Sequence, residues 1–166
     1  MVILGIDPGY ERMGFGCILK TGSTVRHLAS GTIQTPRIGL AERLKVIHAE
    51  IERLIAEHQP DVLAVEKLIF AANKTTAFDV AKAVGVVLLA ASERGIEVSE
   101  FSPPEVKQSV VGFGAAEKKQ VQFMVAKLLG LKEAPKPDDA ADALAVAICC
   151  SFKRPLTRPL AARDPG

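Results

Sequence analysis

Two short apolar runs, each closed by a carboxylate, constrain the fold of this chain more than any other feature. Residues 2–6 read Val-Ile-Leu-Gly-Ile and are followed by Asp7, and a second run, from Asp61, closes on Glu66. Continuous apolar runs of this length are typical of strands buried on both faces, as in parallel sheets covered by helices. The chain is therefore expected to be an α/β protein in which two buried strands end in an acid.

The rest of the chain alternates between strand and helix patterns. Asp7-Pro8-Gly9 ends the first strand with turn residues, and apolar residues recur at spacings of three and four between residues 38 and 58. In chain order, the sequence predicts strands at 2–6, 14–20 and 24–35, a helix at 38–58, a strand at 61–66, a helix at 74–94, a strand at 96–101, and helices at 103–111, 117–129 and 138–152.

This order predicts a five-stranded mixed sheet, with three antiparallel strands followed by two parallel ones, flanked by helices on both faces. A strand-helix-strand crossover implies parallel pairing of the two strands that it joins. With 166 residues, the chain fits one domain, which we expect to span residues 1–152. Residues 153–166 contain prolines and bases and are expected to form a disordered tail.

Composition favours a cytoplasmic protein. Hydrophobic residues make up 48% of the chain, which is enough for a buried core. The three cysteines, Cys17, Cys149 and Cys150, show no metal-type spacing and predict no disulfide framework. The N-terminus lacks the basic region of a signal peptide, and no apolar run reaches the ~18 residues of a membrane span, so no membrane is expected to be involved.

The net charge of +2 is uninformative, but its distribution is not. Between residues 103 and 132 there are five lysines and two acids. If a metal site absorbed four of the 19 acids, 15 acids would remain against 21 bases, and this weakly positive exterior would suit a polyanionic substrate. A solvated lysine-rich face is the simpler alternative, and composition does not choose between the two.

Asp7 and Glu66 are the first candidates for chemistry, because ligands bind beyond the carboxyl ends of strands in open α/β sheets. If the two strands are neighbours, the carboxylates lie side by side and repel each other unless a cation lies between them. Mg²⁺ or Mn²⁺, which prefer oxygen ligands, would relieve that repulsion. Taken singly, Asp7 is better explained as a turn residue before Pro8-Gly9, and Glu66 by a partner such as Lys67 or by solvent. The two acids together favour a function.

A second pair of acids is placed by helical spacing. Asp139 and Asp142 stand three residues apart in an alanine-rich segment, and therefore on one helix face. Helix N-capping by Asp138 would explain the first acids of this segment but not Asp142, which begins an apolar stretch. Four carboxylates in one pocket are typical of two-metal phosphodiester hydrolysis. The histidines are scattered, and His27, His48 and His58 are all expected at the surface, outside any ligand cluster.

Five collinear motifs resemble the RuvC family of Holliday junction resolvases, at that family's spacing and over residues 1–152. The motifs are Gly5-Ile6-Asp7-Pro8-Gly9, Val65-Glu66, the segment from Val106 to Gly112, the segment from Ala116 to Gln122, and the segment from Asp139 to Ala145. The resemblance implies an RNase H-like fold, a homodimer, symmetric paired nicks in four-way DNA junctions, and two Mg²⁺ (or Mn²⁺) ions per active site. It also makes a branch-migration motor complex a candidate partner.

The same resemblance assigns residues. It makes Asp7, Glu66, Asp139 and Asp142 the catalytic, metal-binding acids, with Asp7 bridging both ions, Glu66 on one and the Asp139/Asp142 pair on the other. It makes Lys107, Lys118 and Lys119 DNA-binding residues, with Lys118 stabilising charge on the phosphate. The family usually carries a base-stacking aromatic where this chain has Ile69. The adjacent Phe70 is predicted to take that role, against the alternative that it belongs to the core.

Three other functions would share some of these sequence features. An actin-like or sugar-kinase ATPase would share an Asp-x-Gly turn after its first strand but needs far more than 166 residues. A non-catalytic junction-binding protein would keep the lysines but would not need Asp142 in an apolar helix. Another RNase H-like nuclease, acting for example on RNA–DNA hybrids, would use the same acids, and only its substrates would distinguish it.

Overall fold

A five-stranded sheet with the strand order β3-β2-β1-β4-β5 organises the protein. The computed structural model describes residues 1–69 and 74–154. Its elements are β1 (Val2–Asp7), β2 (Arg12–Thr21), β3 (Thr24–Gln34), α1 (Leu40–His58), β4 (Val62–Glu66), α2 (Lys74–Glu93), β5 (Glu97–Phe101), α3 (Pro103–Val111), α4 (Lys118–Leu128) and α5 (Asp138–Lys153).

The sheet is mixed, as the sequence predicts. Strand β1 lies at its centre, antiparallel to β2 on one side and parallel to β4 on the other. Strand β3 extends the antiparallel part and β5 the parallel part. The continuous apolar run of β1 follows from this position, because a central strand covered by helices has no solvent-facing side.

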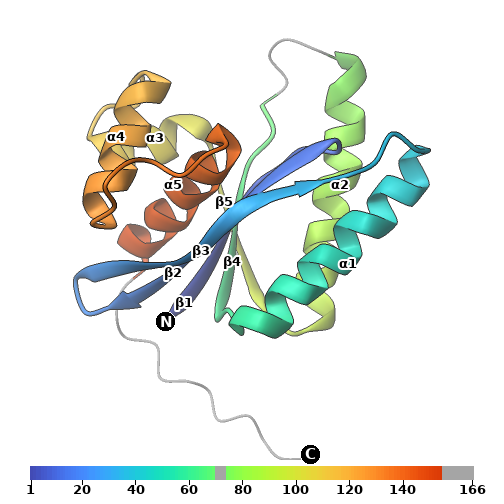
Figure 1. The fold of residues 1–166 in the computed structure, drawn as a ribbon, viewed down its shortest axis with the longest axis horizontal. Helices are drawn as coiled ribbons and strands as arrows, with labels where there is room; N and C mark the ends of the chain where they lie inside the picture. The colour runs from blue at the N-terminus through green and yellow to red at the C-terminus, as the bar shows by residue number, and fades with distance from the viewer. Residues whose placement is uncertain (70–73, 155–166) are drawn as a thin grey trace, which may run out of the picture.

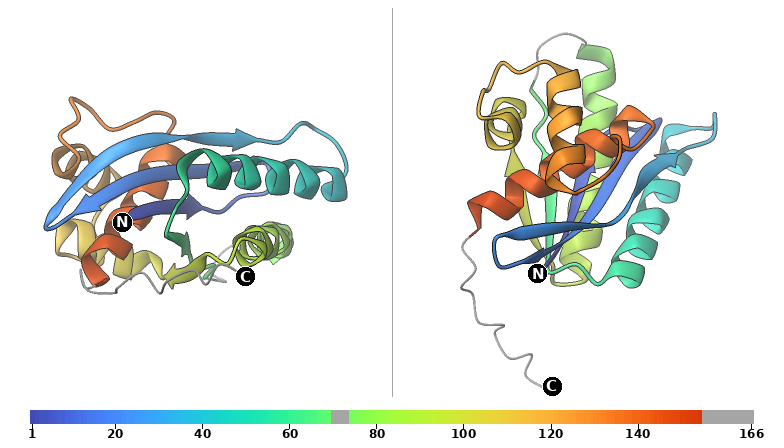
Figure 2. Two further views of the ribbon diagram at one scale, coloured as in Figure 1. Left: turned by 90° about the horizontal axis from the view of Figure 1, so that it is seen from below. Right: turned by 60° about the vertical axis from the view of Figure 1, so that its left-hand side comes forward.

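Helices cover both faces of the sheet (Figures 1 and 2). Helices α1 and α2 pack on one face, where Leu4, Ile6 and Leu63 point into the core beneath them. Helices α3, α4 and α5 cover the other face, over Ile3, Ile18 and Val62. Alternate residues of β1 thus face opposite layers, which is the two-residue period of a strand. No helix in the described ranges has the length and apolar character of a membrane span.

Helix α5 lies unusually close to the sheet, as its alanines predict. A side chain at Gly5 would overlap the carbonyl oxygen of Ala143, and one at Gly16 would come within 2.7 Å of the Leu144 nitrogen. Glycine on the strands and alanine on the helix therefore bring the two backbones almost into contact. Except for Asp142, all the residues of α5 from Ala140 to Ser151 are buried.

The predicted element boundaries need small corrections at functionally relevant ends. Strand β2 begins at Arg12 rather than at Gly14, because Arg12 pairs with Gln34 of β3. Helix α5 is capped by Pro137, so Asp138 is its first residue and not its N-cap. Helix α5 ends at Lys153, one residue beyond the prediction, and residues 155–166 of the expected tail lie outside the described residues.

Candidate active site

The parallel pairing of β1 and β4 brings the first two candidate acids together. Ile6 is in register with Val65, so Asp7 and Glu66 follow at the same edge of the sheet. Both strands end here, where the chain leaves the sheet and its side chains reach solvent. The conditional prediction that these two acids are neighbours is therefore confirmed.

Helix α5 adds a third acid to the same place. Asp142 joins Asp7 and Glu66 in the wall of a cavity of about 230 Å³. The remaining lining residues are Pro103, Val106, Lys107, Lys118, Val121 and Ala145. The close approach of α5 to β1 makes this meeting possible, because a larger residue at Gly5 would push the helix and its carboxylate outward.

Two of the three predicted lysines face these acids. The Nζ atom of Lys118, at the start of α4, lies 2.9 Å from Oδ2 of Asp142 and 3.4 Å from Oδ2 of Asp138. Lys107 of α3 lines the cavity and lowers the pKa of Glu66, against the stronger effect of burial. Lys118 is thus paired with two carboxylates, although its side chain is half exposed.

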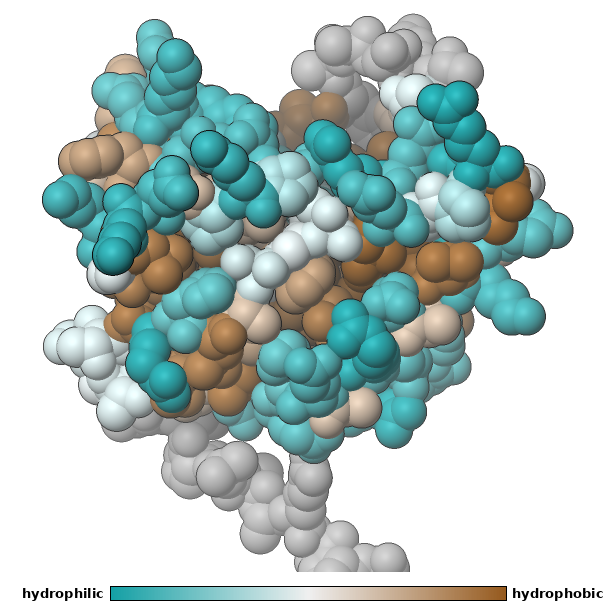
Figure 3. All heavy atoms as spheres, in the orientation of Figure 1, coloured by the Kyte–Doolittle hydropathy of each residue, from teal (hydrophilic) through white to brown (hydrophobic). Residues whose placement is uncertain are grey.

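Lys119 does not reach the cavity. It lines a second, apolar hollow of about 350 Å³ with Val111, Gln120, Phe123 and Met124. Figure 3 shows apolar side chains emerging among hydrophilic ones over the α3 and α4 region. Any contact of Lys119 with a nucleic acid would therefore occur beside the acids and not between them.

Asp139 does not line the cavity, although its charge acts on Asp7, and it has a partner that the sequence did not suggest. Its Oδ2 atom is 2.6 Å from Nε of Arg12, the first residue of β2. The two groups are nevertheless not aligned as a hydrogen bond, and this buried oxygen accepts none. An unsatisfied carboxylate oxygen is costly unless a cation or a donor completes it. Little in the sequence points to Arg12 as a neighbour of Asp139. Its one clue is that it precedes Gly14 by two residues, and Gly14 is a residue at which α5 touches β2.

The acids disturb one another's ionisation. The pKa of Asp7 is raised to about 7, first by burial and then by the charges of Glu66, Asp142 and Asp139. Burial also raises the pKa values of Glu66 and Asp142, and the Lys118 ammonium opposes the shift at Asp142. Carboxyl groups with raised pKa values are typical of functional sites rather than of structural ion pairs.

These residues fit divalent cations. The donors are carboxylate oxygens from β1, β4 and α5, and no thiol or imidazole lines the cavity. Next to the cavity, Oδ2 of Asp139 is buried and has no hydrogen-bond partner. Hard cations such as Mg²⁺ and Mn²⁺ prefer this donor set. A cation would also remove the mutual repulsion that raises the pKa of Asp7.

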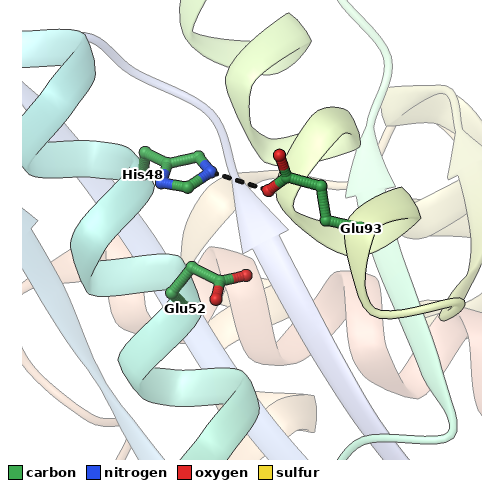
Figure 4. Close-up of side chains that lie close together, drawn as sticks. All are labelled: His48, Glu52 and Glu93. Carbon is green, nitrogen blue, oxygen red and sulfur yellow. Dashed lines mark hydrogen bonds and ion pairs between the residues drawn. The ribbon is translucent and has the colours of Figure 1, made fainter.

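A different cluster corrects the prediction that no histidine belongs to a group of potential ligands. His48 and Glu52 of α1 and Glu93 of α2 bring ligand atoms within 4.8 Å of one another (Figure 4). His48 is hydrogen-bonded to Glu93 at 3.0 Å, and Glu52 is bound by the Arg94 guanidinium. The Arg94 guanidinium neutralises Glu52, and the cluster lies on the helical layer opposite α5.

One predicted site residue, Phe70, lies outside the described residues. Its neighbour Ile69 is described and its side chain is exposed. The chain therefore presents an apolar residue to solvent directly after the strand that carries Glu66.

Fold and site together define an RNase H-like, metal-dependent nuclease. The family model of "Crossover junction endodeoxyribonuclease RuvC" matches residues 3–150. The chain belongs to the RuvC family.

Individual relatives agree with this family. A crossover junction endodeoxyribonuclease RuvC of Heliobacterium modesticaldum is 53% identical over 152 residues, covering 91% of this chain and 94% of the relative. The structure of Thermus thermophilus RuvC is 39% identical with a TM-score of 0.85, and the match covers 92% of this chain and 94% of that one. T. thermophilus RuvC in complex with a Holliday junction substrate is 40% identical with a TM-score of 0.87, covering 92% and 93%.

Proposed function

We propose that this protein resolves four-way (Holliday) DNA junctions in recombination and repair by hydrolysing phosphodiester bonds in symmetric paired nicks. The observation that carries the proposal is the cavity shared by Asp7, Glu66 and Asp142, beside two lysines and next to Asp139. This constellation combines ligands for hard cations with positive groups for a phosphate. Because the chain belongs to the RuvC family, we infer that the phosphate is that of a four-way DNA junction.

The acids are proposed to hold two Mg²⁺ (or Mn²⁺) ions. Asp7 projects from the central strand between the other acids and would bridge both ions, Glu66 would hold one, and Asp142 with Asp139 the other. When bound, such ions lower the pKa of a water nucleophile and stabilise the leaving oxygen. The role of the carboxylates is to fix positions, and α5 keeps Asp142 in place through its contact with β1.

The lysines act on the substrate in this proposal. Lys118 lies within 2.9 Å of Asp142, so its ammonium can neutralise a phosphate oxygen next to the acids. Lys107 approaches from α3 and would orient the same strand. Lys119 would contact the DNA farther from the cut, and Phe70 would stack on a base near Glu66.

We also propose that the protein acts as a two-fold homodimer, because a two-fold partner matches the symmetry of the junction. The exposed face of α2 supports this. It carries Phe78 and Leu89, which are 64% and 53% exposed, with Gly85 between them. A side chain at Gly85 would meet nothing within 4 Å, so no contact in the described chain requires this helix-weakening residue. Close approach of a second α2 helix would explain the glycine, because a side chain at this position would keep the two helices apart.

Three further assignments complete the proposal. Residues 1–152 form a single nuclease domain, followed by a tail. The buried, unpaired state of Cys17, Cys149 and Cys150 supports a reducing, cytoplasmic location. A branch-migration motor that moves the junction is the class of protein partner that would deliver this substrate.

The decisive experiment compares three substrates of matched sequence: a four-way junction, a linear duplex and an RNA–DNA hybrid. With Mg²⁺, we expect paired nicks in the junction and little cleavage of the other two. Asp7→Asn should abolish cleavage while junction binding, measured in Ca²⁺, is retained. Equal cleavage of junction and duplex would refute the resolvase assignment, and preferred cleavage of the hybrid would identify another RNase H-like nuclease.

A further inference from the structure

Arg12 lies on β2 next to Asp139, where the start of α5 contacts the sheet. Register pairing places it at the first position of β2, opposite Gln34, while Asp7 pairs with Gly14 two residues further on. A Cβ atom at Gly14 would overlap the backbone of Asp139, so the missing side chain lets the start of α5 touch β2. The backbone therefore brings Arg12 within reach of Asp139, and the half-exposed side chain completes the contact.

The contact between Arg12 and Asp139 is close but incomplete. Nε lies 2.6 Å from Oδ2, yet Oδ2 accepts no hydrogen bond. The Arg12 side chain is 52% exposed and the Asp139 side chain 20%, so the guanidinium lies on the solvent side of the carboxylate. A group in that position can move away without opening a cavity in the core.

The positive side chains near the four acids are unevenly distributed. Asp142 is paired with Lys118 and Asp139 with Arg12, whereas Asp7 and Glu66 have no ion-pair partner among the described residues. The positive charge of Arg12 thus lies next to Asp139, on the side of the site where a cation held by Asp139 and Asp142 would lie. A guanidinium 2.6 Å from Oδ2 repels a divalent ion that approaches the same carboxylate, so the two cations compete for it.

We propose that Arg12 is a positioning residue that holds Asp139 while the site lacks metal and is displaced when a divalent cation binds. It therefore raises the metal concentration at which the site fills. The inference rests on the metal site of the proposed function. The guanidinium is half exposed and its contact with Oδ2 is not aligned as a hydrogen bond, so the ion pair is weak. A divalent ion therefore displaces the guanidinium readily, and the effect on metal affinity is modest.

The test is direct titration of the DNA-free protein with Mn²⁺, followed by calorimetry or by the loss of the free-ion electron paramagnetic resonance signal. Arg12→Ala should bind Mn²⁺ about two- to five-fold more tightly than wild type. Arg12→Gln, which keeps the side-chain length, should do the same if the alanine variant folds poorly. Arg12→Lys, which keeps the charge, should stay close to wild type.

Two controls separate this contact from a change in net charge. Arg26→Ala removes the same charge from an exposed position at the other end of the β2–β3 ladder and should leave the affinity unchanged. In an Asp139→Asn background, Arg12→Ala should have no further effect, because the competing contact is already lost.

Unchanged or weaker Mn²⁺ binding in folded Arg12→Ala and Arg12→Gln would overturn the inference, as would a gain that persists in the Asp139→Asn background. Those results would leave the proposed nuclease intact, provided that the wild type binds Mn²⁺ and Asp7→Asn does not. If neither wild type nor Arg12→Ala bound Mn²⁺, the metal site and this inference would both be wrong.

Discussion

Asp7 shows how a single side chain can oppose folding in order to serve a site. It closes the central strand, is largely buried, and lies within the electrostatic reach of three other acids. Its pKa of about 7 means that, near neutral pH, the metal-free protein either retains a proton there or tolerates a buried, repelled charge. Divalent cations compete with that proton, so metal binding and protonation are linked at this residue.

The pH dependence of stability follows from this shift. The folded pKa of Asp7, about 7, exceeds the ordinary value of 3.8, so the folded state binds more protons between these limits. Metal-free stability should therefore fall as the pH rises from 5 to 8. Thermal unfolding in EDTA should show a falling melting temperature, less steep in Asp7→Asn. Saturating Mg²⁺ should remove the trend, because the metal keeps Asp7 ionised in the folded state. A melting temperature in EDTA that rises over this range would contradict the shift.

Two neighbouring aspartates on α5 provide a matched comparison of cavity and surface. Asp142 lines the cavity, whereas Asp138 is exposed and only touches Lys118 from outside. Asp142→Asn should lower the rate of junction cleavage by about a hundred-fold or more, because a metal ligand is lost. Asp138→Asn should change it less than about five-fold, as expected of a surface ion pair. Single-turnover cleavage with saturating enzyme measures both.

At the scale of elements, the seam between α5 and the sheet sets the position of the site. Glycines at positions 5, 14 and 16 face the helix backbone, so the separation of α5 from β1 and β2 is fixed by main-chain contact. The alanines of α5 predict this close packing, and the acid-closed strands predict that β1 and β4 are neighbours. The contact of Arg12 with Asp139 could not be predicted, because it depends on the register of β2 and on which way a half-exposed side chain turns.

The seam can be tested with one methyl group. Gly5→Ala would force Ala143 away from β1 and should destabilise the protein by about 1–3 kcal/mol, with cleavage lost because Asp142 moves with the helix. Gly114→Ala is the matched control, because its nearest neighbour would lie at 3.4 Å, an ordinary contact. Denaturant unfolding and junction cleavage report on the two effects. Near-wild-type behaviour of Gly5→Ala would show that α5 can adjust.

At the scale of the whole molecule, the two helical layers serve different purposes. The layer of α3, α4 and α5 carries the cavity, whereas the layer of α1 and α2 presents an exposed apolar stripe and contributes nothing to the lining of that cavity (Figure 1). This division is compatible with the proposed dimer, in which α2 would form the interface and the opposite layer would carry the cavity. The sequence predicted helices on both faces of the sheet but not this stripe. Residues 83–91 of α2 are apolar throughout, so the exposed face becomes visible only once the packing is known.

The dimer proposal has a matched test. Phe78 on α2 and Phe123 on α4 are similarly exposed, at 64% and 60%. Phe78→Asp should convert the protein to monomers, because a charge would be buried between the α2 helices, whereas Phe123→Asp should leave the mass unchanged. Light scattering after gel filtration measures this directly. A dimer that survives Phe78→Asp, or a wild-type monomer, would exclude α2 as the interface.

The contact of Gly5 with the α5 backbone has a further consequence, for motion. Side chains between two elements usually act as a compliant layer that lets the elements shift relative to each other, and here that layer is missing. Asp7 on the strand and Asp142 on the helix are therefore expected to fluctuate as one rigid body. The distance between the two carboxylates should then stay constant while the surrounding loops adjust to the DNA.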